Sequence, residues 1–235
     1  MSDWWQWSPK EGGTDQLGFA VVGIGRFGSA VCRELIRNGS DVLAVDCSQR
    51  AIDELRQLEP SIEARVVDST DEESIRAAGV LEMGTVVVGI SEPIEASITT
   101  TLIAKDSEGS KVQQVIARAT SDLHEKMLKR VGADRVVFPS RMQGERLGLE
   151  LIRPNLIERL ELDDQIGIDE IKVPAIFVGR SLRDLNLRKN YMVNVLAAGP
   201  TKGLTVNPPA SYVLKKSHVL VVMGSMEDLQ KLPHN

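Results

Sequence analysis

Hydrophobic positions between residues 19 and 138 form short apolar runs that alternate with longer segments of mixed polarity. The runs have strand length and end in Gly, Asp or Ser, whereas the intervening segments carry apolar residues at helical spacing. Strands are predicted at 19–22, 42–45, 64–67, 85–89, 115–119 and 135–138, and helices at 26–38, 49–58, 71–78, 94–105 and 122–130. Continuous apolar strands such as 86–88 are typical of a parallel sheet covered on both faces. The alternation predicts a doubly wound α/β domain of the Rossmann type.

Residues with capping preferences support these helix limits. Thr70 and Glu73 have the spacing of a capping box at the start of the helix 71–78. Gly39, Gly79 and Gly132 stand where three helices are expected to end, and glycine is the residue that most readily ends a helix.

The pattern changes after residue 138 and predicts a second, smaller α+β domain. A helix at 144–153 is followed by strands at 168–173, 193–198, 204–206 and 219–223, with short helices at 181–185 and 226–231. The glycines of the segment 199–203 predict a hairpin turn. The last strand reads as an edge strand, with His218 before it in a solvated turn. We therefore expect a tail at 1–16, a Rossmann domain at 17–153 with its crossover helix, and a C-terminal domain at 157–235.

Composition narrows the function classes. The 235 residues are 42% hydrophobic and 26% charged, which is ordinary for a soluble globular protein. The net charge of −5 disfavours nucleic-acid binding, because phosphate neutralisation needs a basic excess. No apolar run has the length of a membrane span, and the N-terminus lacks a signal-peptide pattern. Cys32 and Cys47 provide no disulfide framework. These features predict a cytoplasmic protein.

A glycine-rich segment carries the clearest chemistry. The sequence GIGRFG at 23–28 follows the first strand and opens the first helix. Gly23 permits the tight turn, Gly25 lets a phosphate approach the backbone, and Gly28 lets helix and strand pack closely. Asp46 ends the second strand, at the distance expected for an acid that binds ribose hydroxyls. Together these residues predict a nucleotide site.

Further residues fall at the same end of the predicted sheet, each with two interpretations. Arg26 is unfavourable in the first turn of a helix unless an anion is present, so it either contacts phosphate, in its own or a neighbouring subunit, or points into solvent. Asp68 and Ser69 either face adenine or start the next helix. Arg118 contacts either phosphate or a carboxylate. The other residues predicted to bind the nucleotide are Ile24, Phe27, Cys47 and Ile90.

No reaction centre accompanies this site. His124, His218 and His234 are not clustered at metal-ligand spacing, and no nucleophile-elbow, zinc-protease or Walker motif occurs, so neither a catalytic residue nor a catalytic metal is predicted. A nucleotide site without a reaction centre favours a sensor over an enzyme. The alternative is an NAD-dependent Rossmann oxidoreductase of unknown substrate.

Several longer segments resemble a known family. The stretches at 19–46, 66–80, 115–119 (VIARA) and 131–139 (VGADRVVFP) are similar to the regulator-of-K⁺-conductance domain, called RCK, KTN or TrkA-N. The stretches at 179–199 and 219–224 resemble its companion TrkA-C (RCK_C) domain. The order of the two domains, without duplication, is that of KtrA/TrkA-type regulators of bacterial potassium uptake.

The resemblance implies a homodimer that assembles into an octameric ring on an integral-membrane K⁺-translocating subunit of the TrkH/KtrB kind, at the inner face of the plasma membrane. It implies ATP/ADP or NAD(H) as a regulatory ligand. By resemblance, the segment 23–28 forms the phosphate loop, Asp46 binds ribose, Asp68 and Ser69 lie against adenine, and Arg26 reaches the γ-phosphate of ATP.

Two further expectations also come from the resemblance. Relatives often carry glutamate after the VxxP segment, as part of an intersubunit cation site, whereas this chain has Ser140, so no metal site is predicted. Some relatives bind cyclic di-AMP in the TrkA-C domain through residues that correspond to Arg188 and Asn194, which flank Tyr191. From the residues alone, this polar pair has surface and strand-edge roles as the alternative.

All three tryptophans, Trp4, Trp5 and Trp7, lie in the predicted tail. Tryptophan contributes mainly when it is buried or lies at an interface. They are expected either to cover a groove on the protein's own Rossmann domain or dimer partner, or to dock on the membrane subunit or the lipid interface.

Overall fold

A computed structural model describes residues 18–234, so the tryptophan-rich tail lies outside the described residues. Within the described chain, residues 18–143 and residues 144–234 form two compact units. Each is built around its own hydrophobic core. No helix among residues 18–234 has the length and hydropathy of a membrane span. The exact domain limits stay a prediction.

The first unit is a six-stranded parallel sheet with the strand order β3-β2-β1-β4-β5-β6. Its strands are β1 (Phe19–Val22), β2 (Val42–Asp46), β3 (Glu63–Val66), β4 (Thr85–Val88), β5 (Gln114–Arg118) and β6 (Arg135–Val137). All neighbouring pairs are parallel. The order reverses between β1 and β4, and the ends of these two strands are where doubly wound folds bind ligands.

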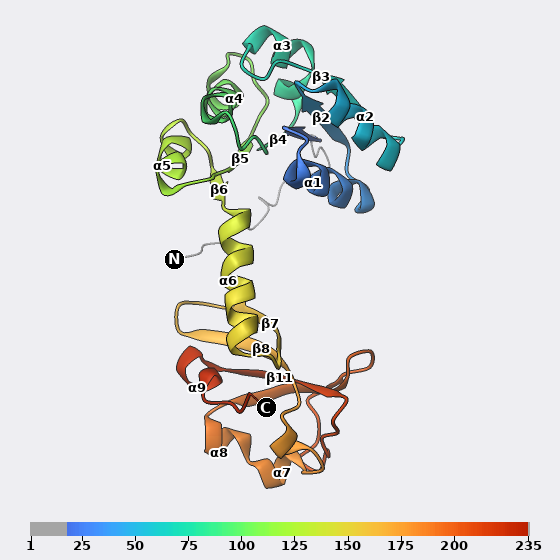
Figure 1. The fold of residues 1–235 in the computed structure, drawn as a ribbon, viewed down its shortest axis with the longest axis vertical. Helices are drawn as coiled ribbons and strands as arrows, with labels where there is room; N and C mark the ends of the chain where they lie inside the picture. Colours follow the sequence, from blue (N-terminus) through green and yellow to red (C-terminus); the bar gives the residue numbers. More distant parts are fainter. Residues whose placement is uncertain (1–17, 235) are drawn as a thin grey trace. The chain divides into compact units, whose positions relative to one another are not determined.

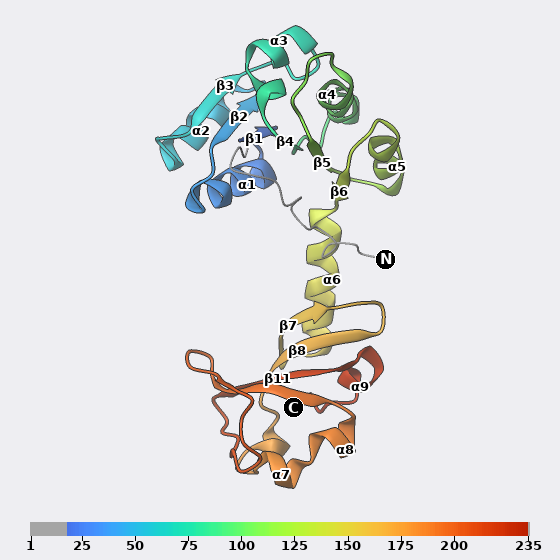
Figure 2. The same ribbon diagram turned by 180° about the vertical axis from the view of Figure 1, so that it is seen from behind.

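Helices cover both faces of this sheet (Figures 1 and 2). They are α1 (Arg26–Arg37), α2 (Gln49–Leu58), α3 (Glu72–Ala77), the 3₁₀ turn η1 (Val80–Glu82), α4 (Ile94–Asp106) and α5 (Asp122–Arg130). Cys32 of α1 and Ile52 of α2 pack against Val21, Ala44 and Val87 on one face. The other face has a separate core, as expected when alternate strand residues point to opposite faces.

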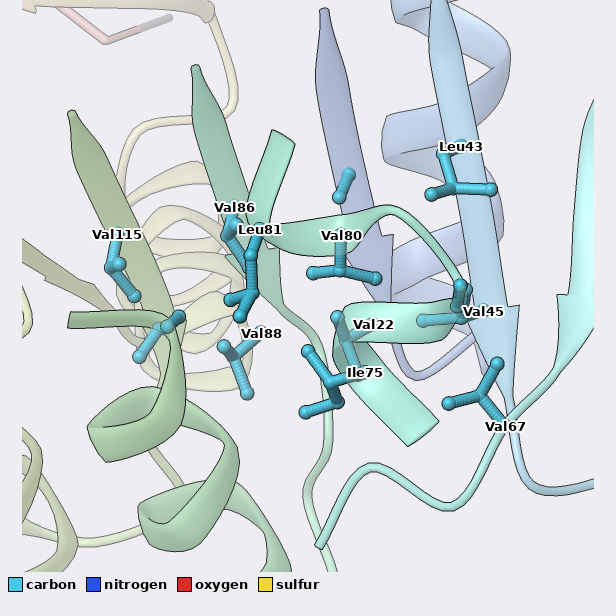
Figure 3. Packing of buried hydrophobic residues seen from close by; sticks show 14 of the residues in the cluster. Val22, Leu43, Val45, Val67, Ile75, Val80, Leu81, Val86, Val88 and Val115 are labelled. Atoms are coloured by element: carbon cyan, nitrogen blue, oxygen red, sulfur yellow. The ribbon is translucent and has the colours of Figure 1, made fainter. Parts of the chain in front are cut away.

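Figure 3 shows this second core from close by. Val22, Val86 and Val88 of the central strands pack against Ile75 of α3 and Leu81 of η1. All five side chains are 1% exposed or less. The continuous valines of the strands are therefore buried on both faces, which confirms the doubly wound α/β prediction.

The second unit is an antiparallel sheet with the order β10-β9-β11-β8-β7. Its strands are β7 (Leu156–Glu161), β8 (Ile166–Lys172), β9 (Asn194–Pro200), β10 (Thr205–Val206) and β11 (His218–Ser225). The short helices are η2 (Ala175–Phe177), α7 (Leu182–Leu185), α8 (Leu187–Tyr191) and α9 (Met226–Gln230). Phe177, Leu185 and Leu229 pack on the buried residues of the sheet. The hairpin predicted at 199–203 joins β9 to β10.

Helix α6 (Pro139–Ile152) spans the residues at which the two units divide. The sequence predicted its start at residue 144, five residues too late. Proline as the first helical residue loses no hydrogen bond, because the first N–H groups of a helix have no internal partner. Pro139 therefore begins the helix rather than preceding it.

Three further predictions were wrong. The segment after residue 153 contains the strand β7, which was not predicted. The strand β11 lies in the middle of the sheet and not at its edge. His218 is therefore 8% exposed and not in a solvated turn, and its Nδ1 accepts from the Lys215 N–H at 3.3 Å. Helix α3 is capped by Asp71, whose Oδ2 accepts from the Ser74 N–H at 2.9 Å. The Thr70 hydroxyl instead donates to a neighbouring carboxylate.

The predicted helix ends at glycine were confirmed: Gly39, Gly79 and Gly132 all have positive φ.

Candidate functional site

A cleft of about 990 Å³ opens at the carboxyl ends of the parallel strands. Val22 and Asp46 line it from the ends of β1 and β2, and Arg118 lines it from the end of β5. The predicted binding residues that line it are Gly23, Gly25, Arg26, Phe27, Asp46, Cys47, Ser69, Ile90 and Arg118. Its size lies at the upper end of the range for small-molecule sites.

The three loop glycines have different tasks. Gly23 has φ +90°, a conformation in which a side chain is strained. A Cβ on Gly28 would lie 2.0 Å from the Gly23 carbonyl oxygen. The start of the helix can therefore approach the turn this closely only because residue 28 has no side chain. A Cβ on Gly25 would meet nothing within 4 Å, so that backbone faces open space in the cleft. The geometry supports the turn role of Gly23 and the packing role of Gly28, and phosphate approach at Gly25 stays a prediction.

Helix α1 starts at this loop with its N-terminus open to the cleft. Gly25 is the N-cap and supplies no side-chain cap, and the first turn contains no acidic residue. Arg26 is exposed and lines the cleft. Free N–H groups, the positive end of the helix dipole and a cation therefore converge on one place, which suits an anion.

Asp46 has a contact that the sequence did not predict. Its Oδ2 accepts a hydrogen bond from the Ile24 N–H at 2.6 Å, and its Oδ1 accepts from the Ser48 N–H at 2.8 Å. The Ile24 side chain is 5% exposed and packs in the core, outside the cleft lining. Asp46 thus braces the glycine loop, and one lone pair on each oxygen stays available for a ligand hydroxyl. Ribose binding by Asp46 stays a prediction.

Arg118 lies over the ring of Phe27, with its guanidinium carbon 5.7 Å from the ring centroid. Its Nε is buried and has no hydrogen-bond partner among residues 18–234. A buried unpaired donor on a cation costs free energy unless a ligand completes it. Of the two interpretations of Arg118, this geometry favours contact with the phosphate of a ligand over pairing with a carboxylate of the protein.

Ser69 and Asp68 differ in their position relative to the cleft. Ser69 is 9% exposed and lines the cleft from the loop after β3. Asp68 is exposed and outside the lining, and its Oδ1 accepts from the Thr70 N–H and hydroxyl. These hydrogen bonds lower the pKa of Asp68 below its usual value. The loop therefore presents Ser69 to the cleft, while Asp68 is engaged locally, and its adenine contact stays a prediction.

The part of the cleft that lies beyond β4 was not predicted from the sequence. The residues there that were not predicted to bind the nucleotide are Gly89, Ser91, Glu92, Pro93, Ala96, Pro139, Ser140 and Gln143, and Val22 and Ala30 also line the cleft. Beyond β4, only Pro139 and Ser140 belong to or follow a stretch that the family resemblance marked, and that stretch was not linked to the nucleotide. Their signal was positional, because they follow β4 and β6 directly, and the carboxyl ends of parallel strands meet at one edge.

Arg188 and Asn194 lie in the second unit, on α8 and at the start of β9. Both are exposed. Neither is among the residues that line the cleft of the first unit, and cyclic di-AMP binding stays a prediction.

Comparison with known proteins gives matches over both units. Residues 19–139 match the TrkA-N domain, and residues 166–233 match the TrkA-C domain. The chain is 34% identical over 213 residues to Ktr system potassium uptake protein C of Bacillus subtilis, covering 91% of this chain and 94% of that protein. It is 31% identical over 211 residues to Ktr system potassium uptake protein A of Vibrio alginolyticus, covering 90% and 94%.

Solved structures support the fold alone. The GsuK channel superposes with a TM-score of 0.66 at 18% identity, covering 95% of this chain and 39% of that chain. The crystal structure of the GsuK RCK domain gives 0.64 at 17% identity, covering 95% and 47%. The sequence matches, which run through both domains in order, carry the assignment: this chain belongs to the family of TrkA-N/TrkA-C proteins that includes the Ktr potassium uptake proteins.

Proposed function

We propose that the chain is the nucleotide-sensing regulatory subunit of a potassium uptake system. One observation carries the proposal: a cleft with an uncapped helix N-terminus and a buried Arg118 Nε that has no hydrogen-bond partner among residues 18–234 lies in a chain related over nearly its whole length to Ktr potassium uptake proteins. The ligand is ATP/ADP or NAD(H). The protein acts by binding rather than by catalysis, at the cytoplasmic face of the membrane.

The proposed mechanism is a shift between conformations. A ligand changes such an equilibrium only through different affinities for the two states. A third phosphate that meets Arg26, in its own subunit or a neighbour, supplies such a difference between ATP and ADP. Subunits that form a homodimer, and then an octameric ring, pass the change to a K⁺-translocating membrane subunit of the TrkH/KtrB kind.

The direct test is calorimetric titration of the full chain with ATP, ADP, NADH and NAD⁺. At least one is expected to bind saturably, and the bound protein is expected to retain a membrane K⁺-translocating subunit in a pull-down experiment. Failure of all four nucleotides to bind would overturn the nucleotide-sensing role. Turnover of NADH with any member of a substrate panel would favour the oxidoreductase instead.

Replacing Asp46 with alanine is expected to weaken ADP binding by about one to two orders of magnitude. The change removes a charge-assisted acceptor for ribose and the hydrogen bond that braces the Ile24 N–H. Calorimetry measures the dissociation constant. Asp53→Ala is the matched control, because Asp53 is an exposed carboxylate on α2 that hydrogen-bonds within its own helix. Equal affinities for the two variants would contradict the role of Asp46.

Replacing Arg26 with alanine is expected to leave ADP affinity within about twofold while lowering ATP affinity about tenfold. The expected contact is with a third phosphate, and charge-assisted hydrogen bonds are among the stronger polar contacts. Arg37→Ala, at the opposite end of α1, controls for the loss of an exposed positive charge. Parallel losses of ATP and ADP affinity would place Arg26 on the inner phosphates and contradict the discrimination.

A further inference from the structure

Helix α4 buries an unusual number of hydroxyl groups. Ser97, Thr100 and Thr101 are all fully buried in it. Threonine is a poor helix former because its side chain is branched at Cβ, and a buried hydroxyl is unfavourable unless it is hydrogen-bonded. Valine or alanine would pack at these positions without that cost. Ser97 Oγ has no hydrogen-bond partner among residues 18–234, so only the two threonine hydroxyls are compensated by hydrogen bonds.

The two buried threonines use their hydroxyls differently. Thr101 Oγ1 donates to the Ser97 carbonyl oxygen at 2.8 Å, one turn earlier in the same helix. Thr100 Oγ1 donates to the Ser69 carbonyl oxygen, also at 2.8 Å, in the loop between β3 and α3, 31 positions away in sequence. Of these two threonines, Thr100 is therefore the one whose hydroxyl connects α4 to a residue that lines the cleft.

The same helix also contributes to the cleft at its start. Pro93, its N-cap, and Ala96, in its first turn, line the cleft directly. Through Thr100, α4 thus holds the Ser69 wall at a defined distance from the wall formed by its own first turn. The strands run in the order β3-β2-β1, so a nucleotide with its phosphates at the glycine loop after β1 and its ribose at Asp46 after β2 has its base toward the loop after β3.

We propose that Thr100 is a positioning residue that acts through Ser69 to shape the adenine end of the cleft. The proposal rests on the nucleotide-binding function. Without the hydroxyl, the Ser69 carbonyl has no other hydrogen-bond donor among residues 18–234, and the loop relaxes to find one in water. The ligand then loses contact with this wall, whereas its phosphates stay bound at the glycine loop.

The test compares Thr100→Val with Thr101→Val in the full chain. Both changes remove one buried hydroxyl of the same helix and keep the side-chain volume. Thr100→Val is expected to weaken ADP binding about threefold to tenfold, and to reduce the preference for ADP over GDP. Thr101→Val is expected to stay within about twofold for both. Thr100→Ser, which keeps the hydroxyl, is expected to restore ADP affinity and base preference.

A second measurement does not depend on any nucleotide. Amide hydrogen exchange of residues 67–71 is expected to become faster in Thr100→Val and to stay unchanged in Thr101→Val. Equal exchange in the two variants, or equal ADP affinity, would overturn the role of Thr100 while the nucleotide site stands. If the unmodified protein bound none of the four nucleotides, the function and this inference would both be overturned.

Discussion

Replacing Asp169 with alanine is expected to destabilise the C-terminal unit by about 3–5 kcal/mol, the usual cost of removing one partner from a buried ion pair. Asp169 lies on β8 and is fully buried. Its carboxylate accepts from Arg153 Nη1 at 2.8 Å and from Arg159 Nε and Nη2, both at 2.7 Å. The side chains of Arg153 and Arg159 are only 3% and 8% exposed.

The effect is large because two guanidinium charges share one carboxylate. The hydrogen bonds to Asp169 raise the pKa of Arg159 above its usual value, and this support is lost in the variant. Both guanidinium groups nevertheless stay charged, because arginine does not lose its proton at neutral pH in proteins. Arg153 has no spare partner, since its Nε and Nη2 are already buried without an acceptor among residues 18–234. Alanine would leave Arg153 in the interior without its carboxylate partner, and Arg159 with only the weaker attraction of Glu161.

Because the chain has two units, this free energy is best measured locally, by amide hydrogen exchange of β8 and β11. Glu170→Ala is the matched control: it removes a carboxylate from the adjacent position of β8, whose side chain points to the opposite face. A loss below about 1 kcal/mol in Asp169→Ala would contradict the ion cluster.

Replacing Gly28 with alanine is expected to destabilise the N-terminal unit by about 3 kcal/mol, at the upper end of the usual cost of overpacking, and to abolish ADP binding. The added Cβ would lie 2.0 Å from the Gly23 carbonyl oxygen and 3.1 Å from its carbon. Both are backbone atoms of a turn with φ +90°, which itself packs closely against Ile90. Only a displacement of α1 or of the turn relieves the overlap.

Gly25→Ala is the control for this change. A Cβ at Gly25 meets no atom within 4 Å, and its φ of −72° suits any residue, so the melting temperature is expected to stay within about 2 °C. Thermal unfolding followed by circular dichroism compares the two variants. Equal melting temperatures would show that α1 adapts to the extra carbon and would contradict the close approach at Gly28.

Local patterns determined much of the first unit. The motif at 23–28 correctly predicted a turn glycine at its start and a packing glycine at its end. Asp46 lies beside this loop because the loop follows β1 and Asp46 ends the adjacent strand β2. Strand β1 and helices α2 and α5 begin and end where the hydrophobic pattern predicted. These features depend on neighbours within a few residues, so a single sequence contains the information.

Prediction failed where several local signals compete. Thr70 and Asp71 are both suitable N-caps, and the structure uses Asp71, because the Thr70 hydroxyl is already bonded to Asp68. The strand β7 was missed because it lies at a sheet edge, where only Leu156 is buried, so it shows no clear alternation. The position of β11 in its sheet depends on pairing with β8 and β9, which are distant in sequence.

The sequence by itself determined the fold class, the glycine loop and the family, because these follow from short-range periodicity and from motifs that stay contiguous along the chain. Tertiary structure alone decided the partners of the buried polar groups. Thr100 reaches Ser69 across 31 positions, and Asp169 joins two arginines from other segments. Such pairs depend on how strands order themselves in a sheet. Hydrophobic burial sets that order through non-directional contacts over the whole unit, and no local pattern encodes it.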